Sequence, residues 1–414
     1  MRGKPLAMLA VVPLFYQDVL PILERKCQTC HREGEAAPMA LETYEQARPY
    51  ARGIRDAVMR HTMPPWFAEA ERGVFGNDPR LTEEEIATLR RWAEAGAPAG
   101  KPVAPAVKWT EGWRIGAPEA VVRMPKAFAV PARGEVDYQH VIVPSEFKED
   151  RWVTAIEVRP SSRAHVHHAV VFVRPPKSVW LRGQPTGELF SAKGQALAGL
   201  STLDEVIAVY LPGAEPHVLP EGHGKLIPAG SDLIFQIHYT ANGKAGEDRT
   251  QVGMVFAKER PRMRHYSMSI AQGEFEIPAN AAEHEVEATF VVNTHTEIYA
   301  LAPHMHLRGK SMRVLAVAPD ESERVLLDVP RYDFYWQLVY RPRRPVRIER
   351  GTEIVVEAVF DNSPANARNP DPRATVRWGE QSREEMAVCF VDFLLPVPIS
   401  PVELFRAPRL GGVK

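Results

Sequence analysis

The sequence predicts a multidomain protein in which a small all-α domain precedes two all-β sandwich domains of the jelly-roll kind. Helical periodicity is confined to the first hundred residues, and a Pro/Ala-rich linker follows at 97–106. Short β-branched runs separated by turn signals fill the remainder. At 414 residues the chain exceeds one ordinary core, so two or three domains are expected.

The composition is that of a globular protein with no special affinity for polyanions. Charged residues make up 25% of the chain, and the formal net charge is −1. The basic residues are not gathered into one long run, so neither nucleic acid nor an anionic membrane surface is favoured as a partner. The 37 prolines favour a loop-rich β protein, because proline breaks helix interiors.

The N-terminus has a basic start at Met1–Lys4 and an apolar run from Pro5 to Phe15. This run is too short to span a bilayer, so no membrane span is expected. It has the pattern of a weak or truncated export signal, and a plain apolar arm is the alternative, because no typical cleavage site follows it.

Two helices are predicted in the N-terminal region. The apolar residues of the first recur at i, i+3, i+4 and i+7 spacing and lead into a cysteine motif: Val19, Leu20, Ile22, Leu23 and Cys27. The second begins with a capping box formed by Thr82 and Glu85 and ends at Gly96. An apolar stripe lies between them at Ile86, Leu89 and Trp92.

The cysteine motif, Cys27-Gln28-Thr29-Cys30-His31, is typical of covalently attached haem c. Two thiols add to the haem vinyl groups, and the adjacent histidine binds the iron. A zinc site is the first alternative, but it requires a second Cys/His pair. A redox dithiol is the other alternative, and it has no use for His31. We therefore predict a small cytochrome c-like haem domain at residues 16–100.

The second axial ligand of this haem is predicted to be Met63. It lies in a proline-stiffened segment, His61–Trp66, between the two helices. His61, Met59 and Met39 are the alternatives. Met/His ligation raises the haem potential, which suits an electron carrier that feeds an oxidising metal site.

The region after the linker is predicted to form two β domains, at 107–262 and 263–400, joined near Lys258–Arg264. The β-branched runs that indicate strands are Arg151–Arg159, His165–Arg174, Asp232–Thr240, Glu285–Val292, Glu353–Phe360 and Glu385–Leu395. Many short strands at this spacing are typical of antiparallel sandwiches or jelly rolls.

Histidine and methionine residues in these strands have the chemistry of copper ligands, because imidazole and thioether both suit copper and thioether selects Cu(I). His304 and His306 are two residues apart and therefore share one face of a strand. Met386 completes this set if its strand lies opposite. The plainer alternatives are two polar residues on an exposed face and a methionine that fills a core.

A second set lies earlier in the chain. Regular pleating pairs His165 with His167, so the use of His167 and His168 on one metal requires a bulge or a strand end there. His238 sits in an apolar strand, where an isolated histidine is more often a hydrogen-bonded core residue. Spacing alone leaves the choice between His165 and His168 open.

The other histidines and the third cysteine lack partners at ligand spacing. Cys389 has no intrachain partner, so no disulfide framework is expected. The remaining histidines are interpreted as surface residues or as supports for the ligands: His140, His217, His223, His265, His284 and His295.

From about residue 107 to 400 the chain resembles the copper type II, ascorbate-dependent monooxygenases. The matching pieces occur in the family's order: Val166–His168, Gln236–Tyr239, His304–Gly309 and Glu384–Met386. The resemblance implies two jelly-roll domains with one copper each, hence two copper ions per chain. It implies that His167, His168 and His238 hold an electron-transfer copper. It also implies that His304, His306 and Met386 hold an oxygen-binding, catalytic copper.

The chain departs from the family at two positions near this second set. Ala302 replaces an arginine that grips a substrate carboxylate in the peptide enzyme, and Phe390 replaces a tyrosine. The disulfides of the animal enzymes are also absent. A glycine-extended peptide is therefore not the expected substrate. The fused haem motif is similar to a bacterial arrangement, which implies a periplasmic or otherwise extracytoplasmic location.

The expected function is hydroxylation of a C–H bond of a small, apolar substrate with O2. Electrons are expected from ascorbate or a redox protein through the fused haem. A copper–haem electron carrier or sensor without oxygenase activity is the alternative from a different class. A zinc scaffold is a third reading, which methionine ligation disfavours.

Overall fold

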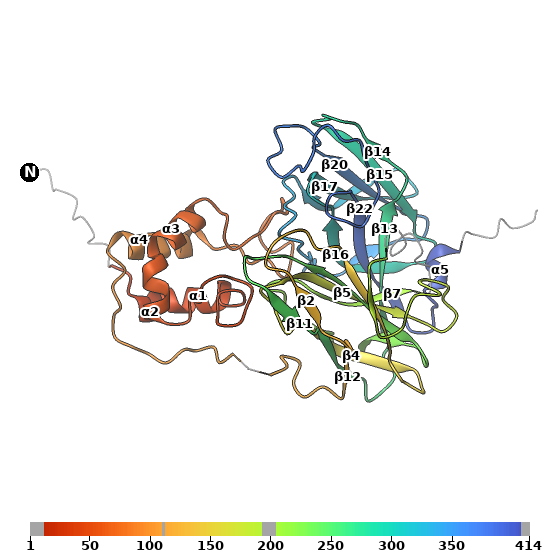
Figure 1. Ribbon diagram of the computed structural model, residues 1–414, viewed down its shortest axis with the longest axis horizontal. Helices are drawn as coiled ribbons and strands as arrows, with labels where there is room; N and C mark the ends of the chain where they lie inside the picture. The colour runs from red at the N-terminus through yellow and green to blue at the C-terminus, as the bar shows by residue number, and fades with distance from the viewer. Residues whose placement is uncertain (1–11, 110–111, 193–203, 407–414) are drawn as a thin grey trace, which may run out of the picture. The chain divides into compact units, whose positions relative to one another are not determined.

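The computed structural model describes residues 12–109, 112–192 and 204–406 and divides the chain into two compact units. The first comprises Met1–Trp66 and Pro79–Thr110, and the second comprises Phe67–Asp78 and Glu111–Lys414 (Figure 1). Most of the apolar run that begins at Pro5 lies outside the described residues. Within the described residues, no helix has the length and apolar character needed to cross a membrane.

The first unit contains short helical elements around a small apolar core. Their bounds are η1 (a π-helix) Phe15–Val19, α1 Leu20–Lys26, α2 Tyr44–Ala47, η2 (a 3-10 helix) Arg48–Tyr50, α3 Ala51–Met59 and α4 Glu83–Glu94. The capping box predicted at Thr82 is confirmed, because its hydroxyl accepts from the Glu85 N–H while the Glu85 carboxylate accepts from the Thr82 N–H. Leu23, Leu89 and Trp92 are fully buried in this core.

The predicted fold class is wrong in its first part, because no all-α cytochrome c domain is evident. Helices account for only 12% of the structure, and the two longest helices of this unit, α3 and α4, have 9 and 12 residues. The segments 27–43 and 60–66 are almost entirely turns, bends and irregular chain. Prolines interrupt the helical pattern, notably Pro64 and Pro65, since proline lacks the N–H that an α-helix requires. The two predicted helices are therefore present, but they do not make up an all-α domain.

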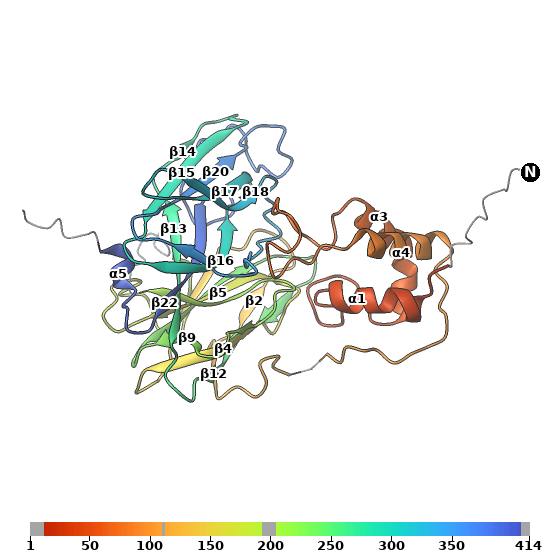
Figure 2. The ribbon, with the colours of Figure 1, turned by 180° about the vertical axis from the view of Figure 1, so that it is seen from behind.

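The second unit is built from sheets whose strands are mainly antiparallel, which fit the jelly-roll part of the prediction (Figures 1 and 2). The largest sheet has the order β1 (Ala120–Arg123), β12 (Gln251–Phe256), β4 (Arg151–Arg159), β9 (His223–Ile227), β13 (Met263–Gln272), β22 (Ala387–Pro396), β16 (Thr296–His304) and β19 (Val346–Ile348), with β8 (His217–Val218) on β4. A five-stranded sheet has the order β6 (Leu189–Phe190), β3 (Gln139–Pro144), β10 (Asp232–Tyr239), β5 (Val166–Arg174) and β7 (Glu205–Tyr210).

A four-stranded sheet completes the second half of this unit. Its order is β15 (His284–Val291), β20 (Glu353–Phe360), β17 (Gly309–Val317) and β18 (Glu323–Val329). Two small pairs join β2 (Phe128–Val130) to β11 (Gly246–Asp248) and β14 (Glu276–Ile277) to β21 (Val376–Arg377), and a short helix, α5 (Val402–Phe405), follows β22. All six runs predicted as strands are confirmed, with ends that shift by no more than two residues.

The second unit has two halves, which lie before and after the start of β13 at Met263. They are joined through one parallel pair of strands. Residues of β9 pair with β13 at His223↔Met263 and Gly224↔Arg264, so one sheet continues across both halves. The predicted domain join at Lys258–Arg264 falls where the chain enters β13. Because both halves belong to one compact unit, the separate domain boundaries stay a prediction.

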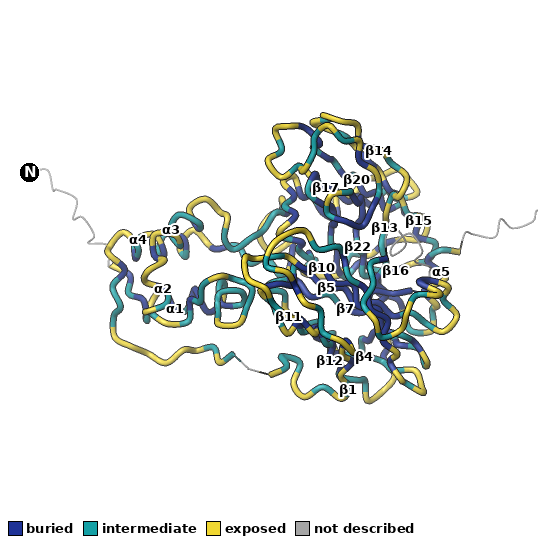
Figure 3. The backbone as a smooth tube through the Cα atoms, in the orientation of Figure 1, coloured by how far each residue is buried: buried dark blue, intermediate teal, exposed yellow. Residues whose placement is uncertain are grey.

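The five-stranded sheet is covered on both faces, which is why β5 and β10 read as continuous apolar runs. Val171 and Phe235 point from one face into a large apolar core of the second unit. Val170 and Ile234 point from the other face into a smaller apolar cluster, against which Phe390 of β22 packs. The tube in Figure 3 is accordingly buried along these strands and exposed mainly in the loops. The second face is the one that carries the site described next.

Candidate metal centre

A β-bulge brings three predicted ligands together at the start of β5. His238 of β10 pairs with His168, but the next residue, Tyr239, pairs with Val166, so His167 is the extra residue of the bulge. The ladder is irregular at this point because two residues of β5 oppose one of β10. His167 can therefore turn toward His168 instead of pointing to the opposite face.

The three imidazoles are close enough to share one ion. Their ligand atoms all lie within 4.8 Å of one another, and the Nδ1 atoms of His167 and His168 are 3.1 Å apart. The Nε2 of His238 lies 3.3 Å from the Ser382 hydroxyl, while its Nδ1 is buried without a partner among the described residues. An unpartnered buried nitrogen is costly unless a ligand or ion satisfies it.

His165, the alternative to His168, has both ring nitrogens engaged. Its Nδ1 lies 2.7 Å from the Ser162 hydroxyl, and its Nε2 lies 3.0 Å from the carbonyl oxygen of Lys244. Neither nitrogen is left to bind a metal. The structure therefore groups His168, and not His165, with His167 and His238.

The second pair of histidines is held in one tautomer by carbonyl oxygens. His304 directs Nδ1 to the Gln337 side-chain oxygen at 2.9 Å, and His306 directs Nδ1 to the Glu384 backbone oxygen at 3.1 Å. Each Nδ1 therefore carries the proton and each Nε2 carries a lone pair. The Nε2 of His306 is buried without a hydrogen-bond partner in the described chain. Metal-binding histidines typically show this pattern.

A buried glutamate connects this pair to the segment that carries Met386. The two carboxylate oxygens of Glu385 accept hydrogen bonds from the backbone N–H groups of His306, at 2.8 Å, and Arg308, at 2.6 Å. Met386, the next residue, is buried and lines a cavity together with His304 and Phe390. Glu385 thus fixes His306 against the start of β22.

The two ligand sets meet in one cluster. The ring centroids of His168 and His304 are 5.8 Å apart, only slightly more than the 5.2 Å within each of the pairs His168–His238 and His304–His306. The spacing of the sequence motifs indicates two separate sites, one in each half. The structure instead brings all five imidazoles to the junction between the halves.

Burial keeps these imidazoles uncharged. Removal from water lowers the pKa of His167 and of His304 to about 4. The pKa values of His168, His238 and His306 fall well below the usual range for the same reason, reinforced by the neighbouring imidazoles. Five neutral imidazoles are five available lone pairs at neutral pH, which is the form that binds transition metals.

The aromatic residues that surround the cluster were not identified from the sequence. Tyr138 stacks on His238 with centroids 4.5 Å apart and lies 6.2 Å from the ring of His306. Phe334 stacks on His167 with centroids 5.1 Å apart. Neither residue has the spacing from other residues that suggests a metal ligand. An aromatic residue beside a predicted strand is normally interpreted as part of the hydrophobic core. Only the folded chain shows that both enclose the histidines.

A small cavity lies beside His168, His304 and Met386. Its volume is about 60 Å³, and Val170, Val209, Leu211 and Phe390 contribute apolar walls. Ala302, one of the two positions at which the sequence departs from the copper monooxygenase family, also lines it. The polar side chains of Gln236, Gln337 and Glu380 also line it, and none of its lining side chains is positively charged at neutral pH.

The Cys-x-x-Cys-His motif, for which the sequence predicts haem, lies at the end of α1 in the first unit. Cys27 follows the last turn of α1, and the Nδ1 of His31 lies 3.2 Å from the carbonyl oxygen of Met39. This contact leaves Nε2 of His31 as the nitrogen available to a metal. Of the methionines considered as the second axial ligand, Met59 is exposed, Met39 packs on the core, and Met63 is half-buried.

The remaining histidines do not join the cluster. His140 is buried and contacts the Gln236 side chain, whereas His295 is exposed. His265 is fully buried, with Nδ1 2.9 Å from the Asp392 carboxylate and Nε2 3.1 Å from His223. His265 and His223 therefore belong to a hydrogen-bond network around Asp392 and do not lie together on a solvent-exposed face.

Comparison with known proteins supports a copper assignment for the C-terminal half of the site. Residues 265–403 match the family model "Copper type II ascorbate-dependent monooxygenase, C-terminal domain". This segment includes His304, His306 and Met386. This segment is therefore similar to copper-dependent monooxygenases, a family with which O2, ascorbate and a small-molecule substrate are consistent. A comparison with curated protein sequences gives no match.

A comparison with solved structures gives weak matches. The major capsid protein P2 of bacteriophage PM2 has 6% identity and a TM-score of 0.24, over 66% of this chain and 97% of that one. A structure of infectious bursal disease virus, Gx strain, has 7% identity and a TM-score of 0.20, over 69% and 76%. The Sputnik virophage structure has 7% identity and a TM-score of 0.19, over 82% and 98%. Likenesses this weak say nothing about function.

Proposed function

We propose that this protein is a copper-dependent monooxygenase that hydroxylates a C–H bond of a small, apolar substrate with O2. The observation that carries the proposal is the cluster of five neutral imidazoles, four buried and that of His167 half-buried, with Met386 beside it. Unpartnered buried nitrogens on His238 and His306 fit a metal better than any hydrogen bond available in the described chain. Thioether in the donor set favours copper, in particular Cu(I), over zinc.

The proposed ligands form two sets of three. His167, His168 and His238 form the first, and His304, His306 and Met386 form the second. Copper held there would supply O2 binding and one-electron transfer, chemistry that no protein side chain provides. In the overall reaction one oxygen atom enters the C–H bond and the other becomes water, with two electrons and two protons consumed.

The side chains of this chain contribute position and exclusion of water. Gln337 and the Glu384 carbonyl oxygen hold the protons of His304 and His306 on Nδ1, so both Nε2 atoms face the site. Phe390, Val170 and Leu211 give the adjacent cavity apolar walls that bind an apolar substrate by burial. The neutral Ala302 provides no charge to grip a substrate carboxylate.

We further propose that a haem c attached at Cys27 and Cys30, with His31 and Met63 as axial ligands, delivers the electrons. Support comes from the motif itself and from the hydrogen bond that orients His31 through the Met39 carbonyl oxygen. Ascorbate or a redox protein is the proposed external donor. The proposed location is periplasmic or otherwise extracytoplasmic, in keeping with the fused haem motif.

The direct test is incorporation of ¹⁸O. Copper-loaded protein, ascorbate and a pool of small apolar metabolites are incubated under ¹⁸O2, and the products are read by mass spectrometry. The expected result is a hydroxylated product that carries one ¹⁸O atom per molecule. In a His304→Ala variant that product is expected to disappear.

Control variants separate oxygenation from incidental redox chemistry. His295→Ala removes an exposed imidazole from the same unit and is expected to leave labelling unchanged. Labelled product that persists in His304→Ala contradicts the proposed site. Copper that cycles its redox state without labelled product from any of the apolar pools contradicts the oxygenase and favours an electron carrier.

A further inference from the structure

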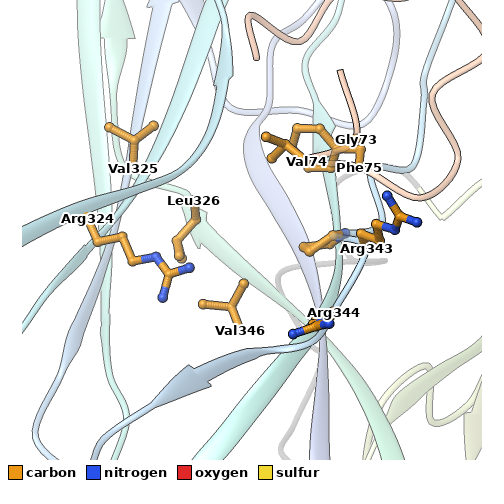
Figure 4. Close-up of a pocket in the computed structure, with 10 residues that line it drawn as sticks. Gly73, Val74, Phe75, Arg324, Val325, Leu326, Arg343, Arg344 and Val346 are labelled. Carbon is orange, nitrogen blue, oxygen red and sulfur yellow. The ribbon is translucent and has the colours of Figure 1, made fainter. Parts of the chain in front are cut away.

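A second cavity lies in the same unit but shares no residue with the histidine cluster. Three segments form it: residues 73–75, strand β18, and the chain from Pro342 to Val346 that leads into β19 (Figure 4). Its volume is about 610 Å³, within the roughly 300–1,000 Å³ range of small-molecule sites. Nothing in the proposed oxygenase chemistry uses it.

Three arginine side chains line this cavity, and no acidic side chain lines it with them. The three are Arg324, Arg343 and Arg344. None of these three guanidinium groups forms an ion pair with another residue of the described chain. Arg347, only three residues after Arg344, is by contrast paired with Glu349 at 2.9 Å. The three arginines thus leave a local excess of positive charge at one cavity.

The remaining wall is apolar, and part of it is unusually open to solvent. Leu326 is buried at the base, and Val346 lies between Arg324 and Arg344 in Figure 4. Val74 and Val325, which come from different segments, are 47% and 48% exposed. Exposed aliphatic side chains beside guanidinium groups form a surface for a ligand with both an apolar part and a charged part.

We propose that this cavity binds a small organic acid that carries an anionic head group on an apolar chain. Guanidinium groups pair with carboxylates in bidentate geometry, which makes arginine the preferred partner of such a head group. Val74, Leu326 and Val346 accept the apolar chain. The site is separate from the histidine cluster, so it stands whether or not the chain is an oxygenase.

The test is calorimetric titration of the full-length protein with octanoate. The expected result is one octanoate per chain, with acetate, which lacks the chain, and octanamide, which lacks the charge, binding at least tenfold more weakly. The double variant Arg324→Gln/Arg344→Gln is expected to weaken octanoate binding at least tenfold. A control double variant, Arg373→Gln/Arg377→Gln, removes the same charge from two exposed arginines elsewhere and is expected to bind as the native chain does.

The other outcomes overturn the proposal. Absence of octanoate binding shows that the cavity is not a site for such an acid. Equal weakening in both double variants shows only a general attraction between an acid and a basic surface. Circular dichroism of the double variant confirms that weak binding is not loss of fold. Vesicles with anionic phospholipid head groups form a second arm: binding to vesicles without binding to free octanoate assigns the arginines to a lipid surface instead of a small acid.

Discussion

The imidazole rings of His168 and His304 lie edge to face with their centroids 5.8 Å apart, although one belongs to β5 and the other ends β16. The two strands lie in different halves of the second unit, which are joined through the parallel pairing of β9 with β13. The packing of the two halves therefore determines the distance between the two ligand sets. Residues that maintain the junction are expected to influence the site from a distance.

Substitution of Met386 by Ile is expected to abolish turnover and leave the haem spectrum intact. The change nearly conserves volume but removes the thioether, and even changes beside a metal ligand typically cost 10–100-fold. We expect kcat to fall by roughly 100-fold or more. Met312→Ile, a matched change at a buried methionine of β17, is the control. Retained activity in Met386→Ile removes this residue from the ligand set.

Glu385→Ala is expected to weaken copper binding at His304 and His306 by about 10–100-fold, because the carboxylate fixes the backbone of His306. Glu385→Gln keeps one acceptor oxygen and is expected to restore part of the affinity. Glu384→Ala is the control, since Glu384 contacts His306 through its backbone oxygen, which the substitution retains. Competition with a Cu(I) chelator measures the affinities. An equal loss in Glu384→Ala contradicts a specific role for Glu385.

His165→Ala is expected to keep the full copper content of the protein. Both nitrogens of His165 are already engaged by Ser162 and Lys244, so the substitution removes two hydrogen bonds and no metal ligand. We expect the free energy of unfolding to fall by about 1–3 kcal/mol. Denaturant unfolding and copper analysis of the same preparation test both parts. Loss of copper in this variant reopens the choice between His165 and His168.

Asp392 is expected to make stability depend on pH in the acid range. Burial alone raises the pKa of this carboxyl, but His265 and Lys225, with the hydrogen bonds from His265 and Ser267, lower it well below its usual value. Because the folded-state pKa lies below the unfolded one, the stabilisation is complete above about pH 4 and declines as the pH falls further.

Asp392→Asn removes this stabilisation and leaves the buried His265 without the carboxylate that pairs with its Nδ1. We expect a loss of about 3–5 kcal/mol at pH 7, measured by denaturant unfolding. The difference from the native chain is expected to shrink as the pH falls below 4. Asp320→Asn, a change at an exposed position, is the control. A difference that is the same at pH 7 and pH 3 contradicts the predicted linkage.

The strands of the second unit could be predicted because their periodicity is local. Arg151–Arg159 and Glu353–Phe360, for example, have the predicted bounds, since β-branched runs bounded by turns specify strands without reference to the fold. The same reasoning failed for the first unit. One periodic and one capped helix signal predict a whole helical domain, but prolines confine the helices of this unit to short segments.

The site was only partly predictable. The histidines could be identified as candidate ligands from their chemistry. The orientation of His167, however, depends on a β-bulge whose position cannot be predicted from the spacing of residues in the sequence. Tyr138 and Phe334 enclose the cluster through contacts that form only when the two halves pack together. The closeness of His168 to His304 is a property of that packing, and no local pattern in the sequence records it.

The most direct measurement is the copper content of the native chain and of His168→Ala and His304→Ala, determined by mass spectrometry after reconstitution and removal of loosely bound metal. We expect two copper ions per native chain and one in each variant, because each substitution removes one of the two sets of ligands. Two copper ions retained in either variant, or none bound by the native chain, contradicts the assignment of these histidines as a copper site.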